Sequence, residues 1–146
     1  MAKNLIHLTF STNERRPIIS AHTREGLNRY MCGILSDLDS PALAANCVAD
    51  HAHILFNLSK NQPLAQVVME VKRVSSKWMK TQGAEFGNFH WQGGYGAFSI
   101  GQSGVAGVKT YISNQEEHHR AKTFQEELRA LLKKYEVPFD ENYLWD

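Results

Sequence analysis

The chain has 146 residues, 42% of them hydrophobic, which is enough to bury one core and too few for two comfortable domains. We therefore expect a single domain spanning residues 1–146, with one active site. Sixteen Lys and Arg residues against fifteen Asp and Glu residues give a formal charge of +1. That balance excludes a uniformly basic polymer binder and confines any nucleic-acid contact to a local patch.

The cysteines and the hydrophobic pattern indicate the compartment. Cys32 and Cys47 do not form a C-x-x-C pair, so the sequence predicts neither a zinc ribbon nor a redox motif. The chain begins without a charged segment followed by an apolar one, and no apolar run is long enough to span a bilayer. We expect a soluble, cytoplasmic protein with no membrane partner and with both thiols reduced and buried.

The first part of the chain predicts a strand, a helix and a pair of strands. Residues 4–10 are β-branched and aromatic enough for a strand. After Ser20, a predicted N-cap, apolar residues recur at helical spacing and predict an amphipathic helix. Residues 43–58 are almost entirely apolar and too long for one strand, so we divide them at Ala49 and Asp50 into two antiparallel strands.

A second amphipathic helix is predicted to begin near Leu64, where apolar residues again recur at helical spacing. The face nearly opposite this apolar stripe carries basic side chains, at about 100° per residue. These could contact DNA phosphates or could simply be solvated. They are Lys72, Arg73, Lys77 and Lys80.

The last part of the chain predicts a bent strand and two helices. Residues 89–100, interrupted by two glycines, indicate a bend that enters a strand. A short helix is expected over residues 108–117, and the glycines ahead of it would allow a hinge. Thr123 and Glu126 form a capping box that begins the last helix.

The order of these elements predicts the fold class. Strand, helix, strand, strand, helix and strand, followed by two helices, fits an α+β fold with a ferredoxin-like antiparallel sheet. We expect helices on one face of the sheet and a C-terminal helical addition carrying a tyrosine, Tyr111.

His51 and His53 are candidate metal ligands. Side chains two apart on a strand point the same way, with α-carbons roughly 6.6 Å apart, so two imidazoles can converge on one ion. Satisfied histidines on a sheet are a common alternative. Cys47 would lie about 13 Å from His51 on an extended segment, too far to share a zinc ion. A histidine-triad hydrolase is excluded because Leu55 stands where the third histidine would be.

Tyr111 and Gln115 lie four residues apart and would share one helix face. Core packing is the common role of a tyrosine at the edge of an apolar stripe. Beside a metal site, however, the phenol is a candidate nucleophile, and the amide oxygen of Gln115 is a candidate third ligand for one hard divalent ion, Mg²⁺ or Mn²⁺. His118, three residues further, could substitute or assist. A cation on a phosphodiester would ease attack by a phenol, which is a poor nucleophile at neutral pH.

Four ordered motifs cover nearly the whole chain. They are residues 50–55 (DHAHIL), 91–99 (WQGGYGAFS), 111–119 (YISNQEEHH) and 139–146 (FDENYLWD). Together they resemble the single-tyrosine HUH transposases of the IS200/IS605 type. Two positions depart from the family pattern: the hydrophobe between the histidines is only Ala52, and Ala49 stands where the family often has proline.

The resemblance implies a transposase that cleaves and rejoins single-stranded DNA at the ends of a mobile element through a 5′-phosphotyrosine intermediate. By position, Tyr111 would be the nucleophile, and His51, His53 and Gln115 would be the metal ligands. The resemblance also implies recognition of DNA hairpins and a homodimer whose active sites are shared between chains.

Two other functions remain open at this stage. A replication initiator or relaxase uses the same chemistry, but usually carries a further domain for which no residues remain here. A noncatalytic module would bind single strands by stacking bases on aromatic side chains. That alternative would use Trp91, Tyr95 and Phe98, for which packing in the core or a dimer is the more ordinary role, and it leaves the histidines and Tyr111 unexplained.

Overall fold

The computed structural model describes residues 2–142, 144 and 145. Met1, Tyr143 and Asp146 lie outside the described residues, so the last motif of the sequence is described only in part. Among the helices that are described, none combines the length and the apolar character needed to cross a membrane.

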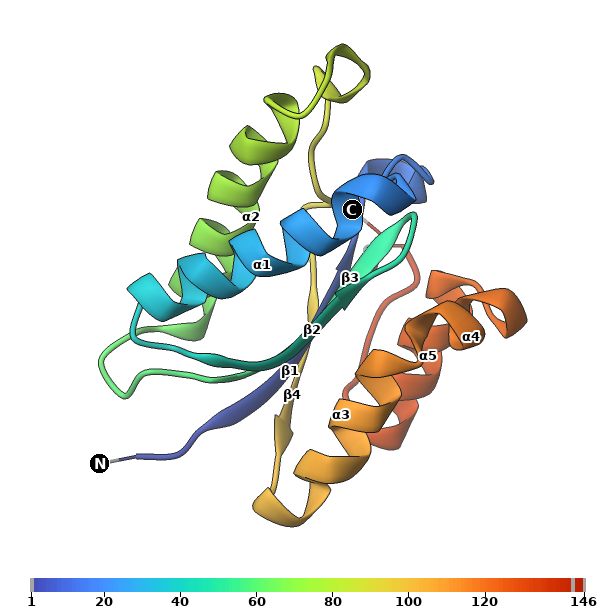
Figure 1. Ribbon diagram of the computed structural model, residues 1–146. Helices are drawn as coiled ribbons and strands as arrows, with labels where there is room; N and C mark the ends of the chain where they lie inside the picture. The colour runs from blue at the N-terminus through green and yellow to red at the C-terminus, as the bar shows by residue number, and fades with distance from the viewer. Residues whose placement is uncertain (1, 143, 146) are drawn as a thin grey trace.

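A four-stranded antiparallel sheet forms the centre of the molecule (Figure 1). Strand β1 (Leu5–Ser11) pairs with β3 (His51–Asn57) on one side and with β4 (Gly96–Ile100) on the other. Strand β2 (Ala42–Cys47) pairs with β3, which gives the order β2-β3-β1-β4. The predicted division of the long apolar run into two antiparallel strands is therefore confirmed.

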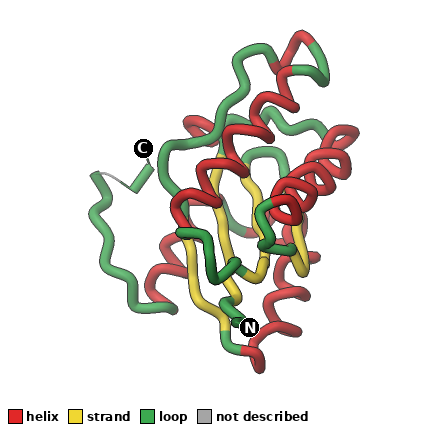
Figure 2. The backbone as a smooth tube through the Cα atoms, turned by 90° about the vertical axis from the view of Figure 1, so that its left-hand side faces the viewer, coloured by secondary structure: helices red, strands yellow, loops and turns green. Residues whose placement is uncertain are grey.

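Helices cover both faces of the sheet, as the views in Figure 1 and Figure 2 agree. On one face lie α1 (Ala21–Asp37) and α2 (Leu64–Lys80). On the other lie α3 (Val105–Ser113), α4 (Gln115–Ala121) and α5 (Phe124–Lys134). Short 3₁₀ turns occupy Asn13–Arg15, Ala84–Phe86 and Gln102–Gly104. The expected α+β architecture is confirmed, but Tyr111 lies on α3 across the sheet from the first two helices, and α4 and α5 follow it.

The alternation of the strands separates the core from the opposite layer. Leu8 and Ile54 are fully buried in the main core, where they pack with side chains of α1 and α2. Their sheet neighbours Leu5 and Leu55 face the other way and pack with Ile112 of α3. Polar residues of β1 and β3 are thereby enclosed beneath the second layer of helices.

Residues 89–100 form less strand than expected, because only the last five pair regularly with β1. In the preceding segment, Trp91 makes a single bridge to Thr12. The side-chain oxygen of Gln92 accepts the backbone N–H of Ser11 at 2.8 Å, and the backbone N–H of Gln92 donates to Ser11 O at 2.9 Å. The side-chain amide of Gln92 thus replaces part of the backbone hydrogen-bond ladder between this segment and β1. Trp91 is buried in the core, whereas Tyr95 is exposed.

The expected helix over residues 108–117 is in fact two helices. Helix α3 begins earlier, at Val105, and ends at Ser113, and α4 begins at Gln115. Asn114 between them has φ −97° and ψ 20°, which interrupts the helical path. The glycines before Tyr111 all have negative φ, so none is required by its backbone conformation. The capping box of Thr123 and Glu126 is confirmed at the start of α5.

Both cysteines are free thiols. Cys47 is buried in the main core, as expected, but Cys32 on α1 is only partly buried.

Candidate active site

Strand β3 places both histidines of the predicted metal pair on the same side of the sheet. His51 and His53 are each 0% exposed, and their rings lie 5.2 Å apart at 79°. Ala52 between them faces the main core and is also fully buried. The strand alternation on which the prediction depended is therefore present, and the small residue between the histidines is accommodated in the core.

The orientation of the His51 ring follows from its carboxylate neighbour. Nδ1 of His51 lies 2.7 Å from Oδ1 of Asp50. A carboxylate only accepts, so Nδ1 carries a hydrogen, and Nε2 is the nitrogen that faces the site. That Nε2 lies 3.0 Å from Oε1 of Gln115, the first residue of α4. The predicted third ligand therefore faces Nε2 of His51, although it belongs to a different helix from Tyr111.

His53 is held by two groups that the sequence did not single out. Its Nδ1 lies 2.8 Å from Nε2 of His7 on β1, and its Nε2 lies 2.5 Å from Oε1 of Glu127 on α5. Burial, with the adjacent His53, lowers the pKa of His7 to about 3. Burial likewise lowers the pKa of His53. Both rings are thus neutral near pH 7, with His7 donating to His53 and His53 donating to Glu127.

Glu127 is the main functional residue missed from the sequence. It is 2% exposed and ionised: burial would raise the pKa, but the hydrogen bond from His53 and the nearby His51 hold it at about 2. A sequence signal was present. Glu127 lies three residues after Phe124 and four before Leu131, both buried, so the apolar face of α5 includes this one carboxylate. A charged residue at a core position requires partners.

Tyr111 lies across this group. Its hydroxyl donates to Oε1 of Glu127 at 2.8 Å, and its ring stacks on His118 with centroids 4.5 Å apart. Burial raises the pKa of the phenol, and the negative charge of Glu127 raises it further. Helix α3 is fixed near this point, because Asn46 of β2 donates to the backbone oxygen of Ile112 at 2.9 Å. The stacking also means that His118, the predicted auxiliary residue, contacts the phenol ring directly.

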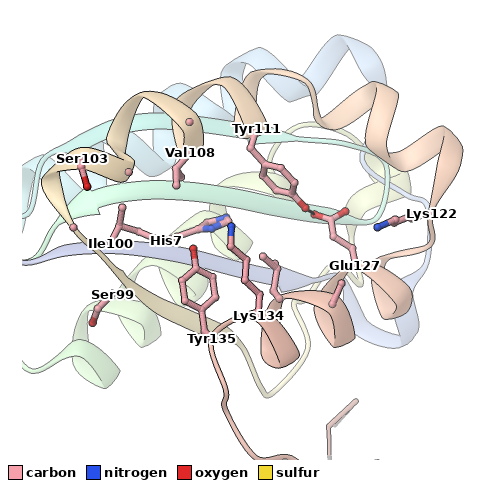
Figure 3. Close-up of a pocket in the computed structure, with 15 residues that line it drawn as sticks. His7, Ser99, Ile100, Ser103, Val108, Tyr111, Lys122, Glu127, Lys134 and Tyr135 are labelled. Carbon is pink, nitrogen blue, oxygen red and sulfur yellow. Dashed lines mark hydrogen bonds between the residues drawn. The ribbon is translucent and has the colours of Figure 1, made fainter.

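A cavity of about 580 Å³ opens beside the phenol (Figure 3). In Figure 3 the Tyr111 hydroxyl and the Glu127 carboxylate point toward each other, and His7 lines the same cavity. Lys122 and Lys134 also line the cavity, which gives it positive charge. An anionic ligand could therefore reach the tyrosine oxygen through this opening.

The predicted basic face of α2 lies on the other side of the sheet and is partly engaged. Lys72 is half-buried and donates to the backbone oxygens of Gln92 and Gly94 at 2.9 and 2.6 Å, and burial lowers its pKa to about 8. Lys80 donates to Phe89 O at 2.7 Å. These two ammonium groups hold the 89–94 segment. The other two residues of the basic face, Arg73 and Lys77, are exposed. Arg73 forms an ion pair with Glu70 at 2.9 Å.

The donor set fits a divalent ion. One nitrogen each of His51 and His53 and one oxygen of Glu127 lie within 4.8 Å of one another. Oε2 of Glu127 is buried without a hydrogen-bond partner among the described residues. An unpaired buried carboxylate oxygen is costly unless another group completes the site. Imidazole nitrogen and oxygen ligands together suit ions such as Mn²⁺.

The comparisons with known proteins give the family and the fold. The family model described as "Transposase IS200 like" matches residues 2–115, which include both histidines, Tyr111 and Gln115. The chain therefore belongs to the IS200-like transposase family. Among curated proteins, none matches the sequence.

Two solved structures share the fold. A candidate transposase from Deinococcus radiodurans R1 aligns with a TM-score of 0.62 and 20% identity, over 79% of this chain and 92% of that one. A REP-associated tyrosine transposase bound to a REP hairpin aligns with a TM-score of 0.62 and 15% identity, over 82% of this chain and 70% of that one.

Proposed function

We propose that this transposase cleaves and rejoins single-stranded DNA through a covalent bond between Tyr111 and a 5′-phosphate. The observation that supports this most is one carboxylate shared by two groups: Glu127 Oε1 bonds both the Tyr111 hydroxyl and His53, at 2.8 and 2.5 Å. The nucleophile and the candidate metal ligands are thus adjacent within a single chain.

In the proposed reaction, the phenolic oxygen of Tyr111 forms a bond to phosphorus while the bond from phosphorus to O3′ breaks. The phenolic proton leaves along the hydrogen bond to Glu127, and the departing 3′ oxygen takes a proton from water and ends as a hydroxyl. The phosphotyrosine keeps the ester for a later attack by another 3′-hydroxyl, which rejoins the strand. A divalent ion, Mg²⁺ or Mn²⁺, held by His51, His53 and Gln115 would supply positive charge to the phosphate.

We further propose that the DNA is a hairpin from the end of a mobile element, in the cytoplasm. The relative bound to a REP hairpin supports a folded single strand as substrate. The lysines that line the cavity, Lys122 and Lys134, suit a phosphate backbone entering toward Tyr111. Labelled single-stranded oligonucleotides from the flanks of the gene, incubated with Mn²⁺, should give a protein–DNA band that survives denaturant. No such band with any flank, in Mn²⁺ or Mg²⁺, would reject the proposal.

The basic face of α2 is proposed to contact phosphates outside the catalytic cavity. Since Arg73 and Lys77 are exposed, replacing either with glutamine should reduce the slope of log affinity against log salt by about 0.7 for a single strand. Fluorescence anisotropy at several salt concentrations measures this slope. Lys60→Gln, exposed in a loop elsewhere, should leave it unchanged. Slopes equal to wild type in both α2 variants would remove this face from the DNA interface.

A homodimer remains part of the proposal, because one tyrosine holds only one 5′-phosphate and rejoining two element ends needs two. For cleavage itself, all the named groups come from one chain. Mixing Tyr111→Phe with His51→Ala should therefore give no adduct beyond that of either variant alone. Adduct formation restored by mixing would show instead that the tyrosine of one chain completes the site of the other, as the sequence resemblance implied.

A further inference from the structure

We propose that Glu127 is itself a ligand of the divalent ion, beside His51, His53 and Gln115, and that its second oxygen holds the Tyr111 hydroxyl next to that ion. This inference rests on the proposed function and adds a residue of α5 to the metal site. Glu127 lies beyond residues 2–115, to which the family model is matched.

The first argument is the convergence of possible ligand atoms. With Nδ1 of His51 beside Asp50, Nε2 is the nitrogen of this ring that faces the site. Oε1 of Gln115 lies 3.0 Å from this nitrogen, and Oε2 of Glu127 lies 3.7 Å from it. Three atoms that can each donate an electron pair to a cation therefore lie close together. Such a set of nitrogen and oxygen atoms suits a divalent ion.

The second argument is the burial of an unpartnered oxygen. Glu127 is 2% exposed, and its Oε2 has no hydrogen-bond partner among the described residues. Its Oε1, by contrast, accepts hydrogen bonds from both His53 and Tyr111. If Glu127 served only to stabilise the fold, the two hydrogen bonds accepted by Oε1 would be enough. The charge and the free oxygen are accounted for when Oε2 binds an ion.

The third argument is spacing. Ligand atoms that each lie about 2.1 Å from one ion are separated from one another by roughly 3 to 4.2 Å. The separations of His51 Nε2 from Gln115 Oε1 and from Glu127 Oε2 both fall in this range. His53 Nε2 lies closer to Glu127 Oε1, at 2.5 Å, because a hydrogen bond joins them. Binding by His53 requires its other neutral tautomer, in which Nδ1 carries the hydrogen and donates it to Nε2 of His7, while His7 carries its own hydrogen on Nδ1.

The fourth argument is that α5 is packed so that Glu127 has little freedom. The capping box at Thr123 fixes the first turn of the helix. Leu128, the next residue, approaches β4 so closely that a Cβ at Gly96 would lie 2.8 Å from its Cδ1. Gly96 itself pairs with Thr9, two residues after His7 on β1. A glycine at this point lets α5 approach the sheet and brings the carboxylate to the histidines.

The test is Mn²⁺ affinity of the whole chain without DNA, measured by the loss of the free-ion signal in electron paramagnetic resonance. Glu127→Gln keeps the shape and an acceptor for Tyr111 but removes the charge, and should weaken binding at least about 10-fold. Glu127→Asp keeps the charge but withdraws it by one methylene, and should weaken binding as well. Glu126→Gln, an exposed neighbour whose amide preserves the capping box, should bind like wild type.

The outcomes separate this inference from the function on which it rests. Weakened Mn²⁺ binding in both Glu127 variants, with wild-type binding in Glu126→Gln, supports it. Wild-type affinity in either folded Glu127 variant, together with lost binding in His51→Ala, overturns the inference and leaves the metal-dependent function intact. Failure of the wild-type chain to bind Mn²⁺ overturns both. Thermal melting without metal identifies any variant that does not fold, and the other Glu127 variant then decides.

Discussion

Replacing Tyr111 with phenylalanine should abolish the covalent protein–DNA adduct while leaving single-stranded DNA binding close to wild type. The substitution removes one oxygen, which is the atom that would bond to phosphorus. The ring should keep its stacking on His118. The lost hydrogen bond to the ionised Glu127 should cost about 1.5 to 3 kcal/mol of stability. Denaturing gels with labelled DNA measure the adduct, and anisotropy measures binding.

Tyr135→Phe is the matched control, because Tyr135 lines the same cavity. It should form the adduct at nearly the wild-type rate. A noncatalytic binding module would lose nothing on either substitution, since it forms no adduct at all. An adduct that persists in Tyr111→Phe would mean that another side chain is the nucleophile.

Replacing His51 with alanine should slow strand cleavage by about a thousandfold or more. The substitution removes a proposed ligand whose Nε2 faces Gln115 and Glu127, and a bound cation contributes several kcal/mol to a phosphoryl transition state. Because His51→Ala is expected to act by releasing the ion, removing the metal from the wild-type protein with a chelator should slow cleavage by a similar factor. Single-turnover cleavage with saturating protein, at several Mn²⁺ concentrations, measures both effects.

His22→Ala controls for the loss of an imidazole, because His22 is exposed on α1, across the sheet from the site. It should cleave like wild type. Thermal melting must accompany the measurement on His51→Ala, because the change leaves a buried void beside Asp50. Cleavage by a folded His51→Ala protein at the wild-type rate, and without added metal, would contradict the assigned role of the histidines.

Two features made part of this site predictable from the sequence. The alternation of a strand determines that His51 and His53 share a side, whatever covers them. The capping box at Thr123 likewise predicts where α5 begins. Both are local rules, and the structure confirms both. The predicted neighbourhood of Tyr111 and Gln115 also holds, although Asn114 breaks the helix between them.

The remaining parts of the site depend on contacts between distant segments. His7 and Thr9 reach His53 only because β1 pairs with β3 in one particular register. Glu127 reaches it only because α5 packs across the sheet beside Gly96. The sequence predicts a solvated or DNA-facing Lys72, whereas its bonds to the 89–94 segment require that segment to fold back over α2. Helical and strand periodicity carry no information about such pairings.

The most direct test of the central claim is to locate the covalent bond. The adduct formed with a single-stranded oligonucleotide in Mn²⁺ is digested with protease and nuclease, and the peptides are sequenced by mass spectrometry. We predict a nucleotide linked through its 5′-phosphate to Tyr111. A nucleotide attached to any other residue, or an adduct whose free DNA end is a 5′-hydroxyl instead of a 3′-hydroxyl, would contradict the account.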